Sequence, residues 1–270
     1  IENIKYLCHA NPTDFWKKFK EVTKSNIKII LDPADVYSKL KPLSTPPEED
    51  YFDLEFEKEA CAFIDRFCNG DLDLDENEMN EILNSPITIL EVETAIAKLK
   101  KGKSHGLDGL PAEFLLITKD ILAPHLVHIY NYIIEQGEFP EQWAEGLRMA
   151  LPKDGGKDVR PITITPLLSK VLEAIFDTRI TFIEEAFDKC DIYNGGFKKK
   201  SATADNMFVL LGCIQKQLSQ GKSLYIAYVD FRKAFNFVKR SLLFMKIIKS
   251  GLHGNIIKLM INMYCKTKAR

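Results

Sequence analysis

One aspartate stands where a carboxylate could bind a metal ion. Asp230 directly follows residues 223–229, a run dense in apolar and aromatic residues that predicts a β-strand. An acid at the carboxyl end of a buried strand lies at the sheet edge, where it can reach a metal ion without being buried alone. Magnesium binds proteins through one or two carboxylates together with substrate phosphates, so a reaction on a phosphate-bearing substrate is one interpretation. The alternative is an acid that caps the following helix.

Three further segments carry cations that could bind phosphate oxygens. Residues 102–111 form a glycine-punctuated loop that enters a predicted helix, and residues 151–163 read as a short loop with fixed turns. Residues 195–201 place lysines at the start of another predicted helix, where backbone N–H groups already favour anions. A solvated turn is the alternative for this last segment. The cations concerned are Lys103 in the first segment, Lys153 and Arg160 in the second, and Lys198, Lys199 and Lys200 in the third.

The formal net charge of −1 hides two segments of opposite charge. Residues 51–97 hold 13 acidic and 2 basic side chains, whereas residues 201–270 hold 12 basic and 2 acidic ones. The asymmetry indicates either a polyanionic partner for the basic segment or two segments that face each other in the fold. Charge alone leaves both interpretations open.

The composition is typical of a globular protein. Hydrophobic residues make up 46% and charged residues 28% of the 270-residue chain. No apolar run approaches the length of about 18 residues that a membrane helix needs, so we expect no membrane association. Six separated cysteines indicate a reduced intracellular compartment, with nucleus and cytoplasm not distinguishable.

Helices must position the cationic loops. Thr88 and Glu91 predict a capping box, and Ile87 and Val92 a hydrophobic staple, for a helix that runs to about residue 100. The proline-rich residues 41–50 predict a linker. Further helices are expected at residues 11–24, 54–67, 111–118, 121–136, 166–187, 201–219, 239–250 and 254–264.

Taken in order, these segments resemble the reverse transcriptase of non-LTR (LINE-type) retrotransposons. The family patterns "GKxxGxDGxPxEFL", "PxPK…RPIS", "GFRxxxSTxDNxF" and "FxDxxxAFD" correspond to residues 102–115, 151–163, 196–208 and 228–236. Residues 137–143 resemble the family's "GxxPxxW" segment. The resemblance covers about residues 85–270, and the predicted helix at 11–24 is similar to the connector that follows the endonuclease in such polyproteins.

The resemblance implies an α+β fold with a right-hand polymerase organisation. Residues 85–220 would form a mostly helical fingers-like region, and residues 221–270 the first strand or strands of an incomplete palm. Residues 1–50 would be the connector-like helix and linker, and residues 51–84 an acidic helical segment. An upstream endonuclease and a downstream palm and thumb would complete the polyprotein.

The resemblance also implies the partners and the site. An RNA template, a DNA primer and deoxynucleoside triphosphates would bind, with Mg²⁺ as the cofactor. Asp230 would be the first catalytic, metal-binding carboxylate, and Phe235 the ring that blocks a ribose 2′-OH. Lys198 replaces an arginine of the family pattern, which keeps the charge and loses the two-bond grip on phosphate. The other implied contacts are Arg160 and Lys198 with the nucleotide, and Lys103, Lys153, Lys199 and Lys200 with nucleic acid.

The sequence departs from the family at the metal site. No Asp or Glu follows Asp230, where the family has a second carboxylate pair in a Y-x-D-D hairpin, and Asn236 stands in place of an aspartate. One carboxylate cannot hold two Mg²⁺ ions at catalytic spacing. We therefore expect a truncated reverse transcriptase domain that is inactive as this chain. The alternatives are a non-catalytic RNA- or DNA-binding module derived from it and a non-functional degenerate fragment.

Overall fold

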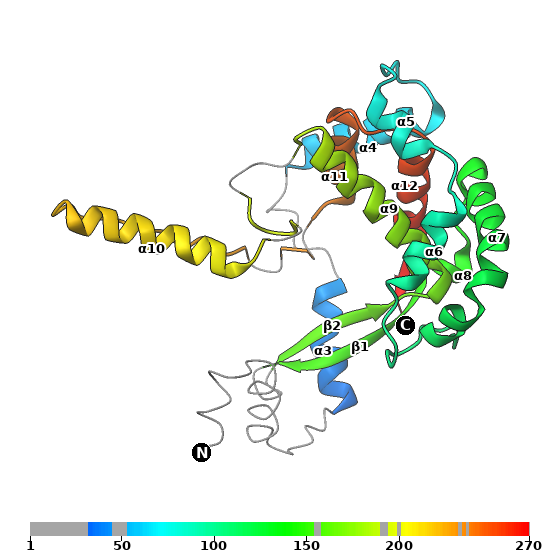
Figure 1. The fold of residues 1–270 in the computed structure, drawn as a ribbon, viewed down its shortest axis with the longest axis horizontal. Coiled ribbons are helices and arrows are strands. Elements are labelled where there is room, and N and C mark those ends of the chain that lie inside the picture. The colour runs from blue at the N-terminus through cyan, green and yellow to red at the C-terminus, as the bar shows by residue number, and fades with distance from the viewer. Residues whose placement is uncertain are drawn as a thin grey trace. The chain divides into compact units, whose positions relative to one another are not determined.

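The computed structural model describes residues 32–44, 53–153, 158–189, 194–198, 201–231, 234–235 and 238–269 (Figure 1). The chain forms two compact units, one made of residues 1–42 and 150–161 and the other of residues 43–149 and 162–270. The predicted helix at residues 11–24 lies outside the described residues. None of the described helices combines the length and the apolar content that crossing a bilayer requires.

In the first unit, α3 (Pro33–Ser44) begins one residue after Asp32, and its last two residues are counted with the second unit. The Asp32 carboxylate accepts the N–H of Asp35 at 3.0 Å, and Lys39 pairs with Asp35 one turn further on at 2.7 Å. The predicted linker is therefore wrong over residues 41–44, which continue this helix. Its remaining residues lie outside the described part of the chain.

The second unit is built mainly from helices, most of which were predicted. Their ends follow local chemistry: the Asp53 carboxylate caps α4, which stops at Gly70 in a left-handed conformation (φ 81°). The predicted capping box of Thr88 and Glu91 at the start of α6 is confirmed. The helices are α4 (Leu54–Asn69), α5 (Glu78–Asn84), α6 (Ile89–Ala97), α7 (Ala112–Gln136), α8 (Glu141–Ala144), α9 (Leu167–Ala186), α10 (Thr203–Ser219), α11 (Arg240–Lys249) and α12 (Asn255–Lys266).

Helix α7 is continuous where two helices, at residues 111–118 and 121–136, were predicted. Pro124 lies inside it and has no N–H to donate to the carbonyl of Asp120. Asp120 is exposed, so water can replace that bond. The two-helix prediction is wrong, because α7 continues through residues 119 and 120, where the break was expected.

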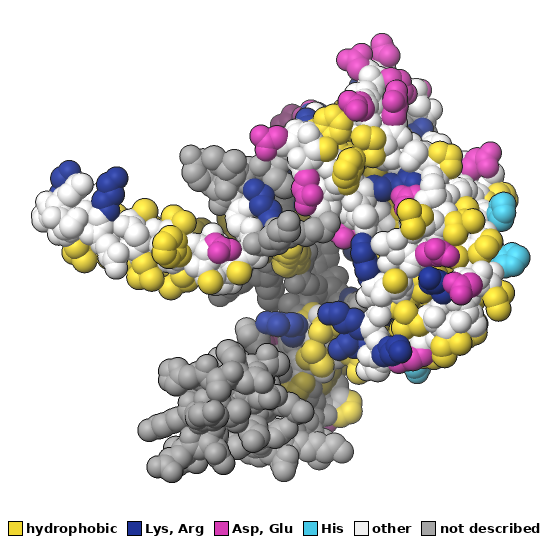
Figure 2. Space-filling model, viewed as in Figure 1, with side chains coloured by type: hydrophobic (Ala, Val, Ile, Leu, Met, Phe, Trp, Pro, Cys, Tyr) yellow, Lys and Arg dark blue, Asp and Glu magenta, His cyan; other side chains and the backbone are white. Residues whose placement is uncertain are grey.

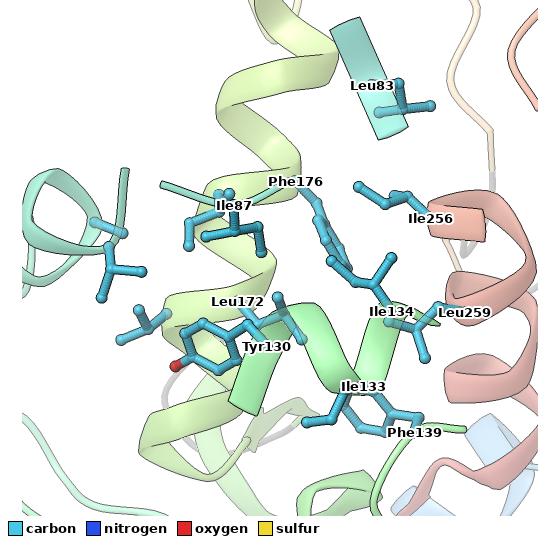
Figure 3. Close-up of a cluster of buried hydrophobic side chains, with 14 of the residues drawn as sticks. Leu83, Ile87, Tyr130, Ile133, Ile134, Phe139, Leu172, Phe176, Ile256 and Leu259 are labelled. Atoms are coloured by element: carbon cyan, nitrogen blue, oxygen red, sulfur yellow. The ribbon is translucent and has the colours of Figure 1, made fainter. Parts of the chain in front are cut away.

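The core lies where α7, α9 and α12 meet. Tyr130 and Ile134 of α7, Leu172 and Phe176 of α9, and Ile256 of α12 are almost completely buried and point into one cluster (Figure 3). Helix α6 covers α7 and α9, and α11 packs on α4. Full burial of one such side chain stabilises a fold by about 1.5–3 kcal/mol, so this cluster is the main support of the helical unit.

A buried arginine ties α9 to the turn between α5 and α6. Arg179 is 6% exposed, and its Nε and Nη2 donate to the two carboxylate oxygens of Glu91 at 2.7 and 3.0 Å. Its remaining N–H groups donate to the carbonyls of Leu83 (2.8 Å), Ser85 (2.6 Å) and Pro86 (3.1 Å). Every donor of the guanidinium therefore has an acceptor, which is what burial of this charge requires.

Three asparagines of the α5 region bind the turn between α11 and α12. Asn77 and Asn80 each donate to the Gly251 carbonyl at 3.0 Å. Asn80 also accepts the backbone N–H of His253 at 2.8 Å, and Asn84 donates to the His253 carbonyl at 2.9 Å. The acidic segment that contains α5 is therefore joined to the basic end of the chain by the amide groups of one buried and two half-buried asparagines.

A small mixed sheet accompanies the helices. Its strands are β1 (Glu145–Lys153), β2 (Asp158–Ile164) and β3 (Lys268–Ala269), in the order β2-β1-β3. Strand β3 runs parallel to β1, with Glu145 opposite Lys268 and Gly146 opposite Ala269. The predicted loop at residues 151–163 is wrong, because all of its described residues belong to β1 and β2. At the level of fold class the α+β prediction is confirmed.

The strand predicted at residues 223–229 is not present in the described structure. Residues 223–229 form no strand in the described structure, and all seven are exposed, with Tyr225 93% and Tyr228 82% exposed. A high β-propensity reflects how well side chains pack against neighbouring strands. Within the described residues no neighbouring strand pairs with this segment, so the strand prediction is wrong here.

Candidate nucleic-acid and nucleotide site

The aspartate of the glycine-punctuated loop fixes the start of α9. The Asp108 carboxylate accepts the N–H of Leu167 at 2.6 Å through one oxygen and that of Leu110 at 3.3 Å through the other. The first N–H groups of a helix have no partner within the helix and favour a negative charge. Asp108 therefore joins residues 102–111 to the first turn of α9.

A glycine in the same loop allows this close approach. A Cβ atom on Gly106 would lie 2.8 Å from the carbonyl oxygen of Thr165 and 3.1 Å from the Cα of Pro166. Real Cβ atoms essentially never come so near to backbone atoms, so a larger residue would force the loop off α9. Gly106 and Asp108 thus act together to hold this loop against the start of α9.

Glu113 closes the other end of the loop. Its carboxylate accepts the N–H of Gly102 at 2.6 Å. This bond, the bond from its own backbone N–H and the nearby charge of Lys101 lower the pKa of Glu113 below its ordinary value. The loop is consequently held at both ends, with the predicted nucleic-acid ligand Lys103 exposed between them.

The aromatic side chains of residues 137–143 pack in the core. The ring of Trp143 lies 6.0 Å from that of Tyr130 and 6.1 Å from that of Phe139, both edge to face. The Phe139 N–H donates to the side chain of Asn262 on α12 at 3.0 Å. This segment therefore positions β1, which follows α8 directly, and contributes no reacting group.

The loop before α10 holds an aromatic ring in an unusual backbone conformation. Phe197 has φ 62°, in the left-handed region that residues with a side chain rarely adopt. Gly195 before it lies so close to the Asn206 side chain that a Cβ would come within 2.7 Å. The Asp205 carboxylate accepts the N–H of Ala202 at 2.7 Å, which fixes the start of the helix.

The structure brings this loop to the segment that follows Asp230. The rings of Phe197 and Phe235 meet edge to face, with centroids 6.1 Å apart and planes 86° apart. Phe235 was a predicted nucleotide-binding residue, whereas Phe197 was not predicted at all. The order Gly-Gly-aromatic before a lysine run was the available signal, because two glycines let the chain turn an aromatic side chain outward.

Asp230 is exposed at the end of the extended segment. Among the described residues, no group of three or more His, Cys, Asp or Glu side chains lies close enough to hold a metal ion. A pair of Mg²⁺ ions needs more than one carboxylate. The described side chains therefore do not fit the two-metal site that the sequence resemblance implies, and we derive no catalytic step through it.

The predicted cations occupy different parts of the chain. Arg160 lies on β2 in the first compact unit and is exposed, whereas Lys103 and Lys198 belong to the second unit. Lys153 is the last residue of β1, and its side chain lies outside the described part of the chain. Lys199 and Lys200 also lie outside it.

Part of the opposite charge in the acidic and basic segments is used within the fold. Lys239, at the start of α11, pairs with Glu57 of α4 at 2.8 Å, and the Lys249 ammonium lies 5.4 Å from the ring centroid of Phe63. Acidic side chains also gather around the loop between α4 and α5 (Figure 2). The interpretation that the two segments face each other is therefore correct for α4 and α11.

Comparison with known proteins gives the class of protein. No family model matches the chain. The "RNA-directed DNA polymerase from mobile element jockey" of Drosophila funebris is 26% identical over 158 residues, which are 57% of this chain and 17% of that protein. The "Putative 115 kDa protein in type-1 retrotransposable element R1DM" of Drosophila melanogaster is 27% identical over 173 residues, or 61% and 16%. A "Retrovirus-related Pol polyprotein from type-1 retrotransposable element R2" of Popillia japonica is 28% identical over 171 residues, or 62% and 23%.

The chain is thus similar to proteins of mobile elements, RNA-directed DNA polymerases among them. More particularly, its homologues are those of the non-LTR retrotransposons jockey, R1, R2 and TX1, as the ordered motifs predicted. The chain spans about a sixth of the length of the first two relatives. The similarity therefore concerns one part of each of these longer relatives.

Proposed function

We propose that the chain is a portion of a reverse transcriptase domain that holds an RNA template and a DNA primer. The ordered motifs carry the proposal, supported by the relatives and by the contact of Asp108 with Leu167, which holds the first motif against the start of α9. In this proposal residues 85–220 form the fingers of a right-hand polymerase, and the palm begins at about residue 221.

The proposed roles of the site residues follow the motif positions. Asp230 supplies one carboxylate for Mg²⁺, and the ring of Phe235 meets the sugar of the incoming nucleotide. Arg160 and Lys198 contact its phosphates. Four further lysines contact the template and primer backbone: Lys103, Lys153, Lys199 and Lys200.

We further propose that a polypeptide of these 270 residues binds nucleic acid and does not polymerise. The basis is the donor count: Asp230 has no second acid after it in the sequence, and Asn236 offers no charge. The same observation favours the second candidate, a non-catalytic RNA- or DNA-binding module. Polymerisation would then depend on carboxylates that these residues do not contain.

Primer extension separates the two parts of this proposal. The purified chain is mixed with an RNA template, a labelled DNA primer, deoxynucleoside triphosphates and Mg²⁺, and extension and binding are both measured. We expect no extension, together with binding that weakens steeply as salt is added, because phosphate contacts release counterions. Extension by the wild-type chain contradicts the inactivity, and binding that is absent or insensitive to salt contradicts the nucleic-acid role.

Substitution of two different lysines provides a matched comparison. Lys103→Gln should weaken binding and lower the slope of log K against log salt by about 1. Lys119→Gln removes a half-buried lysine that already pairs with the exposed Asp120 on α7, so it should leave the slope unchanged. Equal effects of the two changes would exclude a specific role for Lys103.

A further inference from the structure

We propose that the rings of Phe197 and Phe235 form a stacking platform for an unpaired base of single-stranded nucleic acid. The inference rests on the proposed function and adds what this site recognises, namely bases in addition to phosphates. Neither the motif roles given above nor the relatives assign Phe197 any role.

The geometry of the two rings suits a base. They meet edge to face at 6.1 Å, yet Phe197 stays 96% exposed and Phe235 82% exposed. Their mutual contact therefore covers little of either side chain, and both leave apolar aromatic surface in water. Every nucleobase has a flat π-face, so aromatic side chains accept bases of any sequence.

The loop backbone keeps the Phe197 ring outside the core. Its φ of 62° is sparsely populated by residues with a side chain and persists only where the surroundings impose it. Here Gly195 is seated against Asn206 of α10, and the Gly196 N–H donates to the Asn194 side chain at 3.0 Å. The exposed ring is thus carried by a loop whose neighbouring backbone is hydrogen-bonded to Asn194 and close to Asn206.

The charge of the surrounding sequence selects the partner. Lys198 follows Phe197 directly, and residues 201–270 carry 12 basic side chains against 2 acidic ones. Another copy of this basic stretch would be repelled from the same place, whereas a polyanion is attracted. Aromatic faces beside cations are the combination by which proteins hold single strands without sequence preference.

Two oligomers with equal phosphate charge test the inference. One is a fluorescein-labelled oligodeoxythymidine of about 20 nucleotides, and the other is an abasic oligomer of the same length. Binding is measured by fluorescence anisotropy for wild type, Phe197→Leu, Phe235→Leu and the control Phe182→Leu, which removes a 55% exposed ring on α9. Leucine keeps a β-carbon at position 197, so the backbone cost there is unchanged.

We expect each platform variant to weaken binding of oligodeoxythymidine about 5-fold or more, with less than about 2-fold change for the abasic oligomer. Phe182→Leu should change neither affinity. Equal weakening for both oligomers, or none for oligodeoxythymidine, overturns the stacking role while the proposed function stands. Wild type that binds neither oligomer overturns both. A dimer that Phe197→Leu converts to a monomer, at unchanged affinity for oligodeoxythymidine, shows instead that the rings pack on a second copy.

Discussion

Replacing Arg179 with methionine should loosen the junction between α9 and the α5–α6 turn. Methionine has a similar length and no donor, so the change removes five hydrogen bonds and leaves the Glu91 carboxylate without its counter-charge. Removing one partner of a buried ion pair typically costs about 3–5 kcal/mol.

The surroundings of Arg179 narrow the expected loss of stability. The Glu91 side chain is 29% exposed, so water can partly replace the guanidinium, and Ser85 and Pro86 are exposed enough for water to reach their carbonyls. Leu83 is fully buried, and its carbonyl would stay unpaired at a cost of about 1 kcal/mol or more. We therefore expect a loss of about 3–4 kcal/mol, a large share of the about 5–15 kcal/mol that stabilises a typical domain.

Urea unfolding followed by far-ultraviolet circular dichroism measures this loss. With a slope of about 2–3 kcal/mol per molar urea, the midpoint should fall by about 1–2 M. Lys119→Met is the matched control, because its pair with Asp120 is exposed and should be worth less than about 1 kcal/mol. A midpoint of Arg179→Met within about 0.3 M of wild type, at unchanged slope, would refute the idea that this arginine holds the helices together.

Three further changes test the local contacts. Burial alone would raise the pKa of Glu91, but the bonds from Arg179 and Thr88 lower it below the ordinary 4.5. The contribution of the Glu91 carboxylate to the free energy of unfolding is therefore complete above pH 4.5 and is lost as pH falls through the folded pKa. The melting temperature should accordingly drop more for wild type than for Glu91→Gln between about pH 6 and pH 3. Asp108→Ala should cost about 0.5–2 kcal/mol in urea unfolding and Asp108→Asn less, because asparagine keeps an acceptor for the α9 N–H; equal losses would contradict the capping role. Gly106→Ala should cost about 1–3 kcal/mol through its clash with Thr165, whereas Gly212→Ala, in open space on α10, should stabilise by about 0.5–1 kcal/mol in the same assay.

Local signals predicted the helices well because the chemistry that ends a helix lies within a few residues. The capping box of Thr88 and Glu91 and the left-handed Gly70 are both legible in the sequence and present in the structure. The β1–β2 strands escaped prediction because Pro152 and Pro161 made the segment read as turns. For residues 223–229 a strand was predicted that the structure lacks, since their β-propensity requires a neighbouring strand that the described structure does not supply.

The candidate site was predictable only motif by motif. Residue type and order identified Asp230, Phe235 and the cationic loops, and they led to the family that the relatives support. Contacts across long separations were hidden: Asp108 meets Leu167 across 59 residues, and Phe197 meets Phe235 through a ring contact that no local pattern encodes.

The asparagine contacts of α5 set an order of events during synthesis. Asn80 finds its partners 171 and 173 residues further along the chain, in Gly251 and His253. At about 5–20 residues per second, a ribosome needs roughly 10–35 s to make that stretch. Until then water must take the place of Gly251 and His253 at the Asn80 side chain. A helix that is made early therefore gains its native neighbours late, when the turn between α11 and α12 emerges.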